Sequence, residues 1–289
     1  MRLADRILNT ACLLGFKQET PRYGGSGFVV GVPGANGNSH LYLVTAKHIA
    51  ERLECCPIIM GFNHRDGSKA LIEADDVHWY THPTEADAVD AAVTPFPPIE
   101  CDSLDIEPIP EHLFASPENV CDGSIAVGDE ISAIGVFTRF SYEDRHLPIV
   151  RTGNLAMLPN LSMPIRNFEP MEAYVAEIKG LSGSPVWVRQ PAQVKAVDED
   201  VQQSSAFRGA DMLFLGLLHD GWEIPEQVMD AHSSYYTEGM TEGMSIIVPA
   251  HKILEIIHQP ELEAMRREGG EKIAAESHTS GEPVSPDKR

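Results

Sequence analysis

A serine flanked by glycines is the first candidate for chemistry in this chain. In "GLSGSP" (180–185), Ser182 stands between Gly180 and Gly183, directly before an apolar run typical of a strand. A serine hydroxyl attacks a carbonyl only when a base takes its proton, and the resulting oxyanion needs N–H donors. Glycines let the backbone turn sharply enough to direct the amides of Gly180 and Ser182 to one point. The pattern predicts acyl-transfer chemistry, with an ordinary Gly-Ser turn as the alternative.

Candidates for the base, and for the acid that orients the base, lie upstream of Ser182. His48, in "TAKH" (45–48), follows a predicted strand, where a turn can direct its imidazole toward a substrate. Asp90, in "DAAV" (90–93), precedes a short apolar strand, where a buried carboxylate can accept the imidazole Nδ1–H. Taken singly, each of these residues is more often structural. Together they predict a general base and its partner, with Asp87 as a second candidate for the acid.

In the order His, Asp, Ser, the three motifs resemble those of the trypsin-like (chymotrypsin-fold) serine peptidases, which read TAxH, DxAL or DxAV, and GxSGGP. The resemblance covers about residues 8–258. Within the family, the chain is similar to the intracellular bacterial, HtrA-like branch without a PDZ domain. It implies a serine endopeptidase that forms an acyl-enzyme. The implied catalytic residues are His48, Asp90 and Ser182, and the implied oxyanion hole consists of the Gly180 and Ser182 amides.

The same resemblance implies positions that contact the substrate. Ala176 lies six residues before the serine, where the family has the base of its S1 pocket, and His219, Asp220 and Gly221 would line the substrate edge. Because Ala176 has no charge, we expect a small or apolar P1 residue in the substrate rather than Lys or Arg.

Three departures from the secreted members of the family are informative. Leu181 replaces the Asp that pairs with a newly cut N-terminus, so that activation switch cannot operate. Ile49 replaces the cysteine beside the histidine, which fits a reduced enzyme. Ser184 replaces the second glycine of the motif and leaves the glycines at the predicted oxyanion hole in place.

Two other functions remain open. An α/β-hydrolase would need G-x-S-x-G followed by Asp and His; Ser184 occupies the last glycine position, although Asp211 and His251 do follow. A peptidase-like domain that binds peptides without cutting them would carry the same three motifs. Such a binding module differs from an enzyme only in whether the serine reacts.

Metal catalysis has weaker support in the sequence. His78 and His82 in "HWYTHP" have i, i+4 spacing, but no HExxH motif occurs and the residues between them suit a strand and a turn. We therefore expect no metal and no cofactor.

The elements that must position these residues are mostly short strands bounded by Gly, Pro, Asn and Ser. Helices do not alternate with the strands, which favours an all-β fold of two antiparallel six-stranded barrels closed by a C-terminal helix at 249–267. A helical turn is allowed at 48–53. The predicted strands are 11–16, 27–32, 41–46, 69–75, 90–96, 129–137, 149–158, 172–178, 185–190, 212–219 and 244–250.

The chain divides naturally into two barrels and a tail. We predict an N-terminal barrel with His and Asp at 1–120, a C-terminal barrel with Ser and the closing helix at 121–267, and a disordered polar tail at 268–289. A polar segment at 191–210 separates two predicted strands and is either a tolerated insertion or a loop on the substrate side.

Composition limits the partners. With 43 Asp and Glu against 22 Lys and Arg, the net charge of −21 disfavours nucleic acid. No apolar run is long enough to span a membrane, and the first residues do not resemble a signal peptide, so we expect a cytoplasmic protein. Five cysteines, an odd number, are expected to be reduced. The expected partner is a protein or peptide substrate, with a regulatory partner and the oligomeric state left open.

Overall fold

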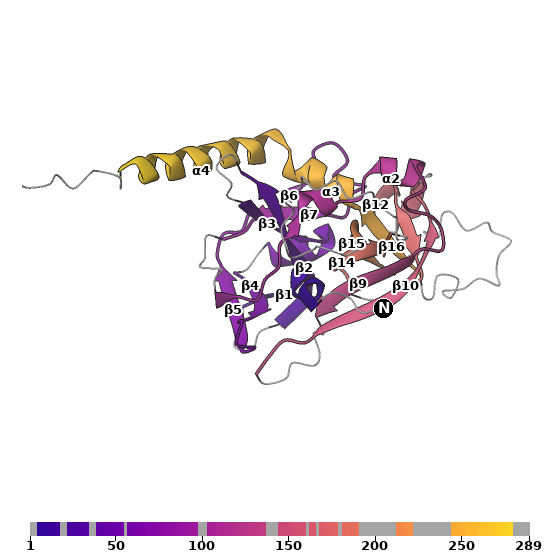
Figure 1. The fold of residues 1–289 in the computed structure, drawn as a ribbon, viewed down its shortest axis with the longest axis horizontal. Helices are drawn as coiled ribbons and strands as arrows, with labels where there is room; N and C mark the ends of the chain where they lie inside the picture. The colour runs from indigo at the N-terminus through magenta and orange to yellow at the C-terminus, as the bar shows by residue number, and fades with distance from the viewer. Residues whose placement is uncertain are drawn as a thin grey trace, which may run out of the picture.

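The N-terminal half is one large, mainly antiparallel sheet. The computed structural model describes residues 5–17, 22–34, 39–54, 57–97, 103–136, 144–159, 162–165, 168–178, 181–190, 212–221 and 244–279. The sheet has the strand order β5-β4-β1-β2-β3-β7-β6, and β8 pairs with β2 in parallel (Figure 1). Its strands are β1 (Ala11–Phe16), β2 (Arg22–Pro33), β3 (Ser39–Thr45), β4 (Ile58–Asn63), β5 (Lys69–Ala74), β6 (Tyr80–Thr81), β7 (Ala92–Pro95) and β8 (Ile109–Pro110).

The C-terminal half is a closed antiparallel barrel in the order β10-β13-β16-β15-β14-β9. This confirms the predicted all-β class and the six-stranded second barrel. The first sheet has eight strands instead of the expected six, because it includes the two-residue strands β6 and β8. The division near residue 120 stays a prediction. The remaining strands are β9 (Glu130–Val136), β10 (Pro148–Met157), β13 (Tyr174–Ala176), β14 (Pro185–Arg189), β15 (Met212–Gly221) and β16 (Ser245–Pro249), with a separate pair β11 (Ser162–Ile165) and β12 (Phe168–Glu172).

The helices are few and most are short. The single helix predicted at 249–267 is two helices, because Pro260 has no N–H to continue α3 and instead begins α4. Helix α4 also passes residue 267, where the sequence predicted a disordered tail; Glu, Lys and Ala residues there favour a helix. Within the described ranges, no helix has both the length and the apolar character needed to cross a bilayer. The helices are η1 (Asp5–Thr10), α1 (Lys47–Leu53), η3 (Glu111–Leu113), α2 (Pro117–Cys121), α3 (Ala250–Ile257) and α4 (Pro260–Thr279).

Aromatic side chains at the centre of the molecule join the two halves. Phe214 on β15 lies edge-on to Phe28 on β2, with ring centroids 5.3 Å apart, and also contacts Phe114 at 4.7 Å and Trp187 at 5.8 Å. Phe28, Phe214 and Trp187 are fully buried. Such pairs contribute about 0.5–1.5 kcal/mol each beyond the burial of their area. This shared core fixes how the two halves face each other.

Helix α4 ties the C-terminal barrel to the first sheet. It follows α3, which packs on β15 and β16, and its first turns lie along β3 and β6 (Figure 1). Arg266 donates a hydrogen bond of 2.7 Å to the Tyr42 hydroxyl, and the Tyr80 hydroxyl contacts the Met265 sulfur at 3.6 Å. Leu262 is fully buried beneath these contacts.

One buried histidine lies apart from the predicted site residues. His146 is 3% exposed, and its main chain makes hydrogen bonds of 2.8 and 2.9 Å with the Asn63 side-chain amide. Among the described residues, its Nε2 has no hydrogen-bond partner. Burial lowers the pKa of His146 to about 4, and the positive charge of Lys69 acts in the same direction.

We expect His146 to make the protein less stable in mild acid. Since its pKa is about 4 when folded, and about 6.5 when unfolded, the unfolded chain takes the proton first. The stabilisation is complete above about pH 6.5 and is lost as the pH falls toward 4, by up to about 3 kcal/mol. Urea unfolding at a series of pH values should show a shallower loss in His146→Phe than in the wild type. Parallel curves for the two proteins would contradict the assignment.

Candidate active site

His48 reaches its position because α1 begins directly after β3. Ala46, the residue before the helix, has no side-chain oxygen to accept the first free N–H groups of the helix. A carboxylate from elsewhere in the chain takes that role: the His48 main-chain N–H donates to Asp90 Oδ1 at 2.9 Å. This main-chain bond ties Asp90 to the start of α1 independently of the His48 imidazole.

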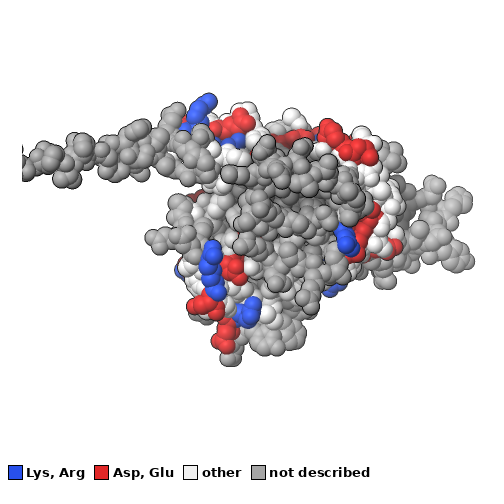
Figure 2. Space-filling view, in the orientation of Figure 1, with Lys and Arg blue, Asp and Glu red and all other residues white. Residues whose placement is uncertain are grey.

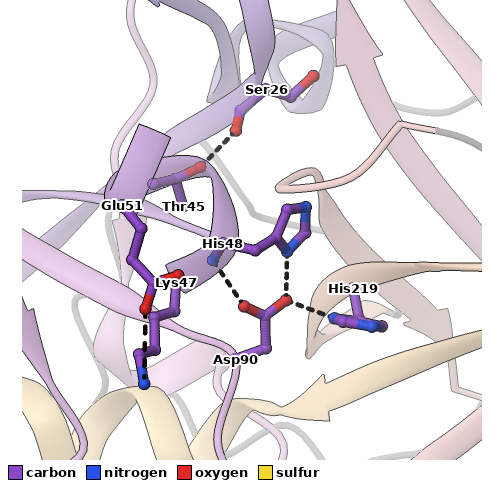
Figure 3. A network of polar contacts seen from close by, with 7 residues as sticks. All are labelled: Ser26, Thr45, Lys47, His48, Glu51, Asp90 and His219. Atoms are coloured by element: carbon purple, nitrogen blue, oxygen red, sulfur yellow. Dashed lines mark hydrogen bonds and ion pairs between the residues drawn. The ribbon is translucent and has the colours of Figure 1, made fainter. Parts of the chain in front are cut away.

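The His48 imidazole makes a second bond to the same carboxylate. Its Nδ1–H donates to Asp90 Oδ2 at 2.7 Å, as Figure 3 shows. Asp90 lies just before β7 and is 0% exposed. Burial acts to raise the pKa of Asp90, but hydrogen bonds from His219 and His48 outweigh it, so the pKa lies below its usual value. An ionised Asp90 holds the proton on Nδ1 and leaves Nε2 of His48 as an acceptor, the form that a general base requires.

A second histidine contacts the same carboxylate oxygen. His219, on β15, donates its Nδ1–H to Asp90 Oδ2, and its side chain is 11% exposed (Figure 3). The rings of His48 and His219 lie edge to face with centroids 5.5 Å apart. The sequence indicated His219 only as part of the substrate edge. Its contact with Asp90 spans 129 residues of chain, and no local signal in the sequence indicates it.

Main-chain bonds on two sides hold the turn that contains Ser182. From the first sheet, the Ser26 N–H donates to the Ser182 carbonyl at 3.1 Å. From β15, the Leu218 carbonyl accepts the Gly183 N–H at 2.8 Å, and the Leu218 N–H donates to the Ser184 carbonyl at 2.9 Å. The residue after Leu218 is His219, so one dipeptide of β15 contacts both the serine turn and Asp90.

The turn has an unusual backbone that places it against α1. Leu181 has a φ of 77° and Gly183 a φ of 83°, both in the left-handed region. A leucine there costs about 1–2 kcal/mol, and such strain is typical of functional turns. A Cβ on Gly183 would lie 2.1 Å from the Ser26 carbonyl oxygen and 3.1 Å from Ile49 Cδ1. The serine turn thus packs on Ile49, the residue next to His48.

We expect Gly183→Ala to disrupt this turn. The new methyl group would collide with the Ser26 carbonyl, whereas Gly67→Ala tests the same backbone conformation (φ 89°) with no atom within 4 Å. The control should lower the free energy of unfolding by about 1–2 kcal/mol. Gly183→Ala should lower it by roughly twice that or more, because backbone must move as well. Equal losses in chemical denaturation would show that the close approach has no energetic role.

The structure brings together some of the predicted site residues and leaves others undetermined. His48 and Asp90 are in contact, and the Ser182 turn packs beside α1; among the described side chains, no hydrogen bond joins the Ser182 hydroxyl to His48. The Ser182 N–H donates to no main-chain carbonyl of the described residues, which leaves it available to an oxyanion. Gly180, the other predicted donor, lies outside the described residues. Asp87, the alternative acid, is exposed.

Two of the residues predicted to contact the substrate lie where three strands of the barrel meet. Ala176 on β13 and Gly221 on β15 both pair with Ser245, at the start of β16. Ala176 and Ser245 are 0% exposed, and the Ser245 hydroxyl donates to the Ile178 carbonyl. The sequence did not indicate Ser245 as a neighbour of these residues, because that contact follows from the register of the three strands. The side chain of Asp220 is not among those described.

The His48, Asp90 and His219 side chains are also a candidate metal site, since their ligand atoms lie within 4.8 Å of one another. Their spacing argues against it. Two ligands of a tetrahedral zinc ion, each about 2.1 Å from the metal, lie about 3.4 Å apart. The His48 Nδ1 and Asp90 Oδ2 atoms are only 2.7 Å apart, which is a hydrogen-bond distance. Hydrogen bonds to the Asp90 carboxylate therefore join the three side chains.

Comparison with known proteins supports the fold. No protein-family model matches the sequence, and no curated protein matches it. The crystal structure of the MamO protease domain from Magnetospirillum magneticum, in its apo form, superposes with a TM-score of 0.54 at 14% identity, covering 89% of this chain and 100% of that one. A crystal structure of Deg5 gives a TM-score of 0.45 at 14% identity, covering 85% of this chain and 86% of that chain. With the closed six-stranded barrel, the first likeness shows that the chain has the fold of trypsin-like serine peptidases.

Proposed function

We propose that this protein is a serine endopeptidase that cleaves peptide bonds through an acyl-enzyme. The observation that carries the proposal is the His48 imidazole, held by Nδ1 on the buried, ionised Asp90 while the Ser182 turn packs on the neighbouring Ile49. In this proposal Ser182 attacks the substrate carbonyl and His48 Nε2 takes the hydroxyl proton. The Ser182 and Gly180 amides bind the oxyanion, and His48 then returns the proton to the leaving amine.

A fluorophosphonate probe tests this proposal directly. The probe reacts with a serine whose hydroxyl has been activated by a base, and it leaves an ordinary surface serine unlabelled. We expect labelling of the wild type and its loss in Ser182→Ala. Labelling that persists in Ser182→Ala would assign the reactivity to another residue, and a peptide map of the labelled protein would identify it.

A second function, peptide binding without cleavage, has one observation in its favour. Among the described side chains, the Ser182 hydroxyl makes no hydrogen bond to His48, so its activation depends on a change of side-chain conformation or on the substrate. A wild type that binds peptides but resists the probe would support this function. A protein that hydrolyses esters but no peptide would instead favour a serine hydrolase that is not a peptidase.

The proposed peptidase should prefer a small or apolar P1 residue. Ala176, Gly221 and Ser245, which meet where the S1 pocket is predicted, offer no charge to a Lys or Arg side chain. A buried cation without a partner is strongly disfavoured. Profiling with a peptide library should therefore yield cleavage mainly after residues such as Ala or Val. Predominant cleavage after Lys or Arg would contradict the assignment and direct attention to Asp220.

Protein or peptide substrates and a cytoplasmic location belong to the same proposal. On the face shown in Figure 2, the described Asp and Glu side chains lie among Lys and Arg side chains, and the described residues of this face form no continuous basic patch for nucleic acid. Cys12, which is buried, and the exposed Cys121 are both free thiols. An exposed free thiol is typical of a reducing compartment, which supports the cytoplasm.

A further inference from the structure

The segment that leads into Asp90 is closed by its own hydrogen bonds. The Glu85 carbonyl accepts the N–H groups of Ala88 and Val89 at 3.0 and 2.8 Å, which folds the start of the segment into a single helical turn. Val89 and Asp90 at its end are both 0% exposed. We call residues 85–90 the acid loop. Because the turn is closed and its end is buried, a shift at the start of the acid loop also moves Asp90.

Lys47 bonds the main chain of the acid loop to helix α1. Its ammonium group donates to the Ala86 carbonyl at 2.6 Å, and its side chain is only 17% exposed. The next residue, His48, bonds to Asp90 through both its main-chain N–H and its imidazole (Figure 3). The first two residues of α1 therefore hold the acid loop at two points, Ala86 and Asp90.

We propose that Lys47 is a positioning residue of the active site, which fixes the acid loop so that the Asp90 carboxylate meets the His48 imidazole. This inference rests on the proposed peptidase function and adds to it a residue that acts through Asp90. Lys47 occupies the position that the motif TAxH leaves variable. A hydrogen bond from a charged donor is roughly twice as strong as one between neutral groups, so an ammonium group holds the loop more firmly than a neutral side chain would.

Neighbouring charges offer two alternative explanations for Lys47 and for how the loop is held. Glu51 lies 3.7 Å from the Lys47 ammonium group, so a simple i, i+4 ion pair on α1 is the first. Lys252 of α3 donates to both carboxylate oxygens of Glu85, at 2.8 and 3.0 Å, and is a second anchor for the acid loop. The Glu85 side chain is 43% exposed, however, and ion pairs open to solvent contribute little. The bond from Lys47 to the main chain is the stronger constraint on the loop.

Five substitutions separate these explanations. Lys47→Met keeps the apolar stem and removes the charge and the donor, whereas Lys47→Arg keeps a cationic donor. Lys47→Gln, with a neutral donor, is milder and replaces Lys47→Met if that variant does not fold. Glu51→Gln removes the ion pair and leaves the bond to Ala86. Lys252→Met makes the same change as Lys47→Met at a lysine of similar burial, 12% exposed, that contacts the acid loop through the Glu85 side chain.

Steady-state peptidase kinetics of the full chain give the first readout. In Lys47→Met we expect kcat to fall roughly 10- to 100-fold, the loss of one bond from a charged donor, and in Lys47→Gln roughly 3- to 10-fold. KM should change less than about 2-fold, because the residues predicted to contact the substrate lie on β13 and β15. Lys47→Arg should recover most of kcat, and Glu51→Gln and Lys252→Met should stay within about 3-fold of the wild type. An unchanged kcat without the Lys47 ammonium group, or an equal loss in Lys47→Arg or Lys252→Met, overturns the proposal.

Nuclear magnetic resonance of histidine labelled with nitrogen-15 gives a second readout that needs no activity. The His48 Nδ1 proton should resonate far downfield because it is shared with the Asp90 carboxylate, and His48→Ala identifies the signal by its loss. Lys47→Met should move this signal upfield and speed its exchange with water, whereas Lys47→Arg and Glu51→Gln should keep it. An identical signal in the wild type and Lys47→Met overturns the positioning role. If the wild type cuts no peptide and resists the fluorophosphonate probe while the signal still changes in Lys47→Met, the peptidase proposal fails and the role of Lys47 stands.

Discussion

Replacing Ser182 with Ala should lower kcat for peptide hydrolysis by roughly four to six orders of magnitude and leave the fold intact. The loss is large because no other group can take the place of the nucleophile, and the remaining rate comes from the oxyanion donors and substrate binding. Stability should change little, because the Ser182 hydroxyl makes no side-chain hydrogen bond among the described residues. Active-site titration with steady-state kinetics measures the effect.

Ser184→Ala is the matched control for this substitution. It removes a hydroxyl two residues away, whose oxygen is buried without a hydrogen-bond partner among the described groups. We expect its kcat to stay within about 10-fold of the wild type. A loss below about 100-fold in Ser182→Ala, or a larger loss in Ser184→Ala, would mean that Ser182 is not the nucleophile.

Replacing Asp90 with Asn should lower kcat by roughly three to four orders of magnitude at neutral pH. The Asn amide keeps the shape of the side chain but offers an N–H group on one side. In the wild type the two carboxylate oxygens accept the His48 main-chain N–H and the His48 Nδ1–H, but in Asn one of these two positions is an N–H donor and cannot accept. The tautomer that leaves Nε2 as a base is therefore disfavoured. Part of the activity should return at high pH.

Asp87→Asn controls for the loss of a nearby negative charge. Asp87 is exposed, and its substitution should change kcat less than about 2-fold. The comparison also decides between the two acids that the sequence left open. Should Asp87→Asn be the more damaging of the two, the assignment of Asp90 as the partner of His48 would be wrong.

The strands that the sequence predicted best are those with a continuous run of branched or aromatic residues between turn residues. The segment 27–32 lies within β2, and the segment 41–46 nearly coincides with β3. Both strands have buried residues and lie in the centre of the first sheet. β4 (Ile58–Asn63) was missed although its apolar run resembles those of β2 and β3 in composition. β8 has two residues and exists only through its pairing with β2, so no pattern within it could indicate a strand.

The candidate site was predictable to the extent that its motifs are local. The His48 and Ser182 motifs each combine a reactive side chain with turn residues in a few positions, and these can be read in sequence order. The contact of His219 with Asp90 depends on how β15 of the barrel faces α1 of the first sheet. Ser245 likewise lies beside Ala176 and Gly221, two residues of the predicted substrate region, only through the pairing of β16 with two other strands. Contacts of this kind follow from the packing of the halves, which no short motif encodes.

The position of α4 has a consequence for how the enzyme would be made. A ribosome completes the first sheet and the C-terminal barrel before it reaches Met265 and Arg266, which contact Tyr80 and Tyr42. Until Arg266 and Met265 have left the exit tunnel, a nascent chain lacks this brace. Tyr42 and Tyr80 therefore gain these contacts late in synthesis, after the strands that carry them have been made.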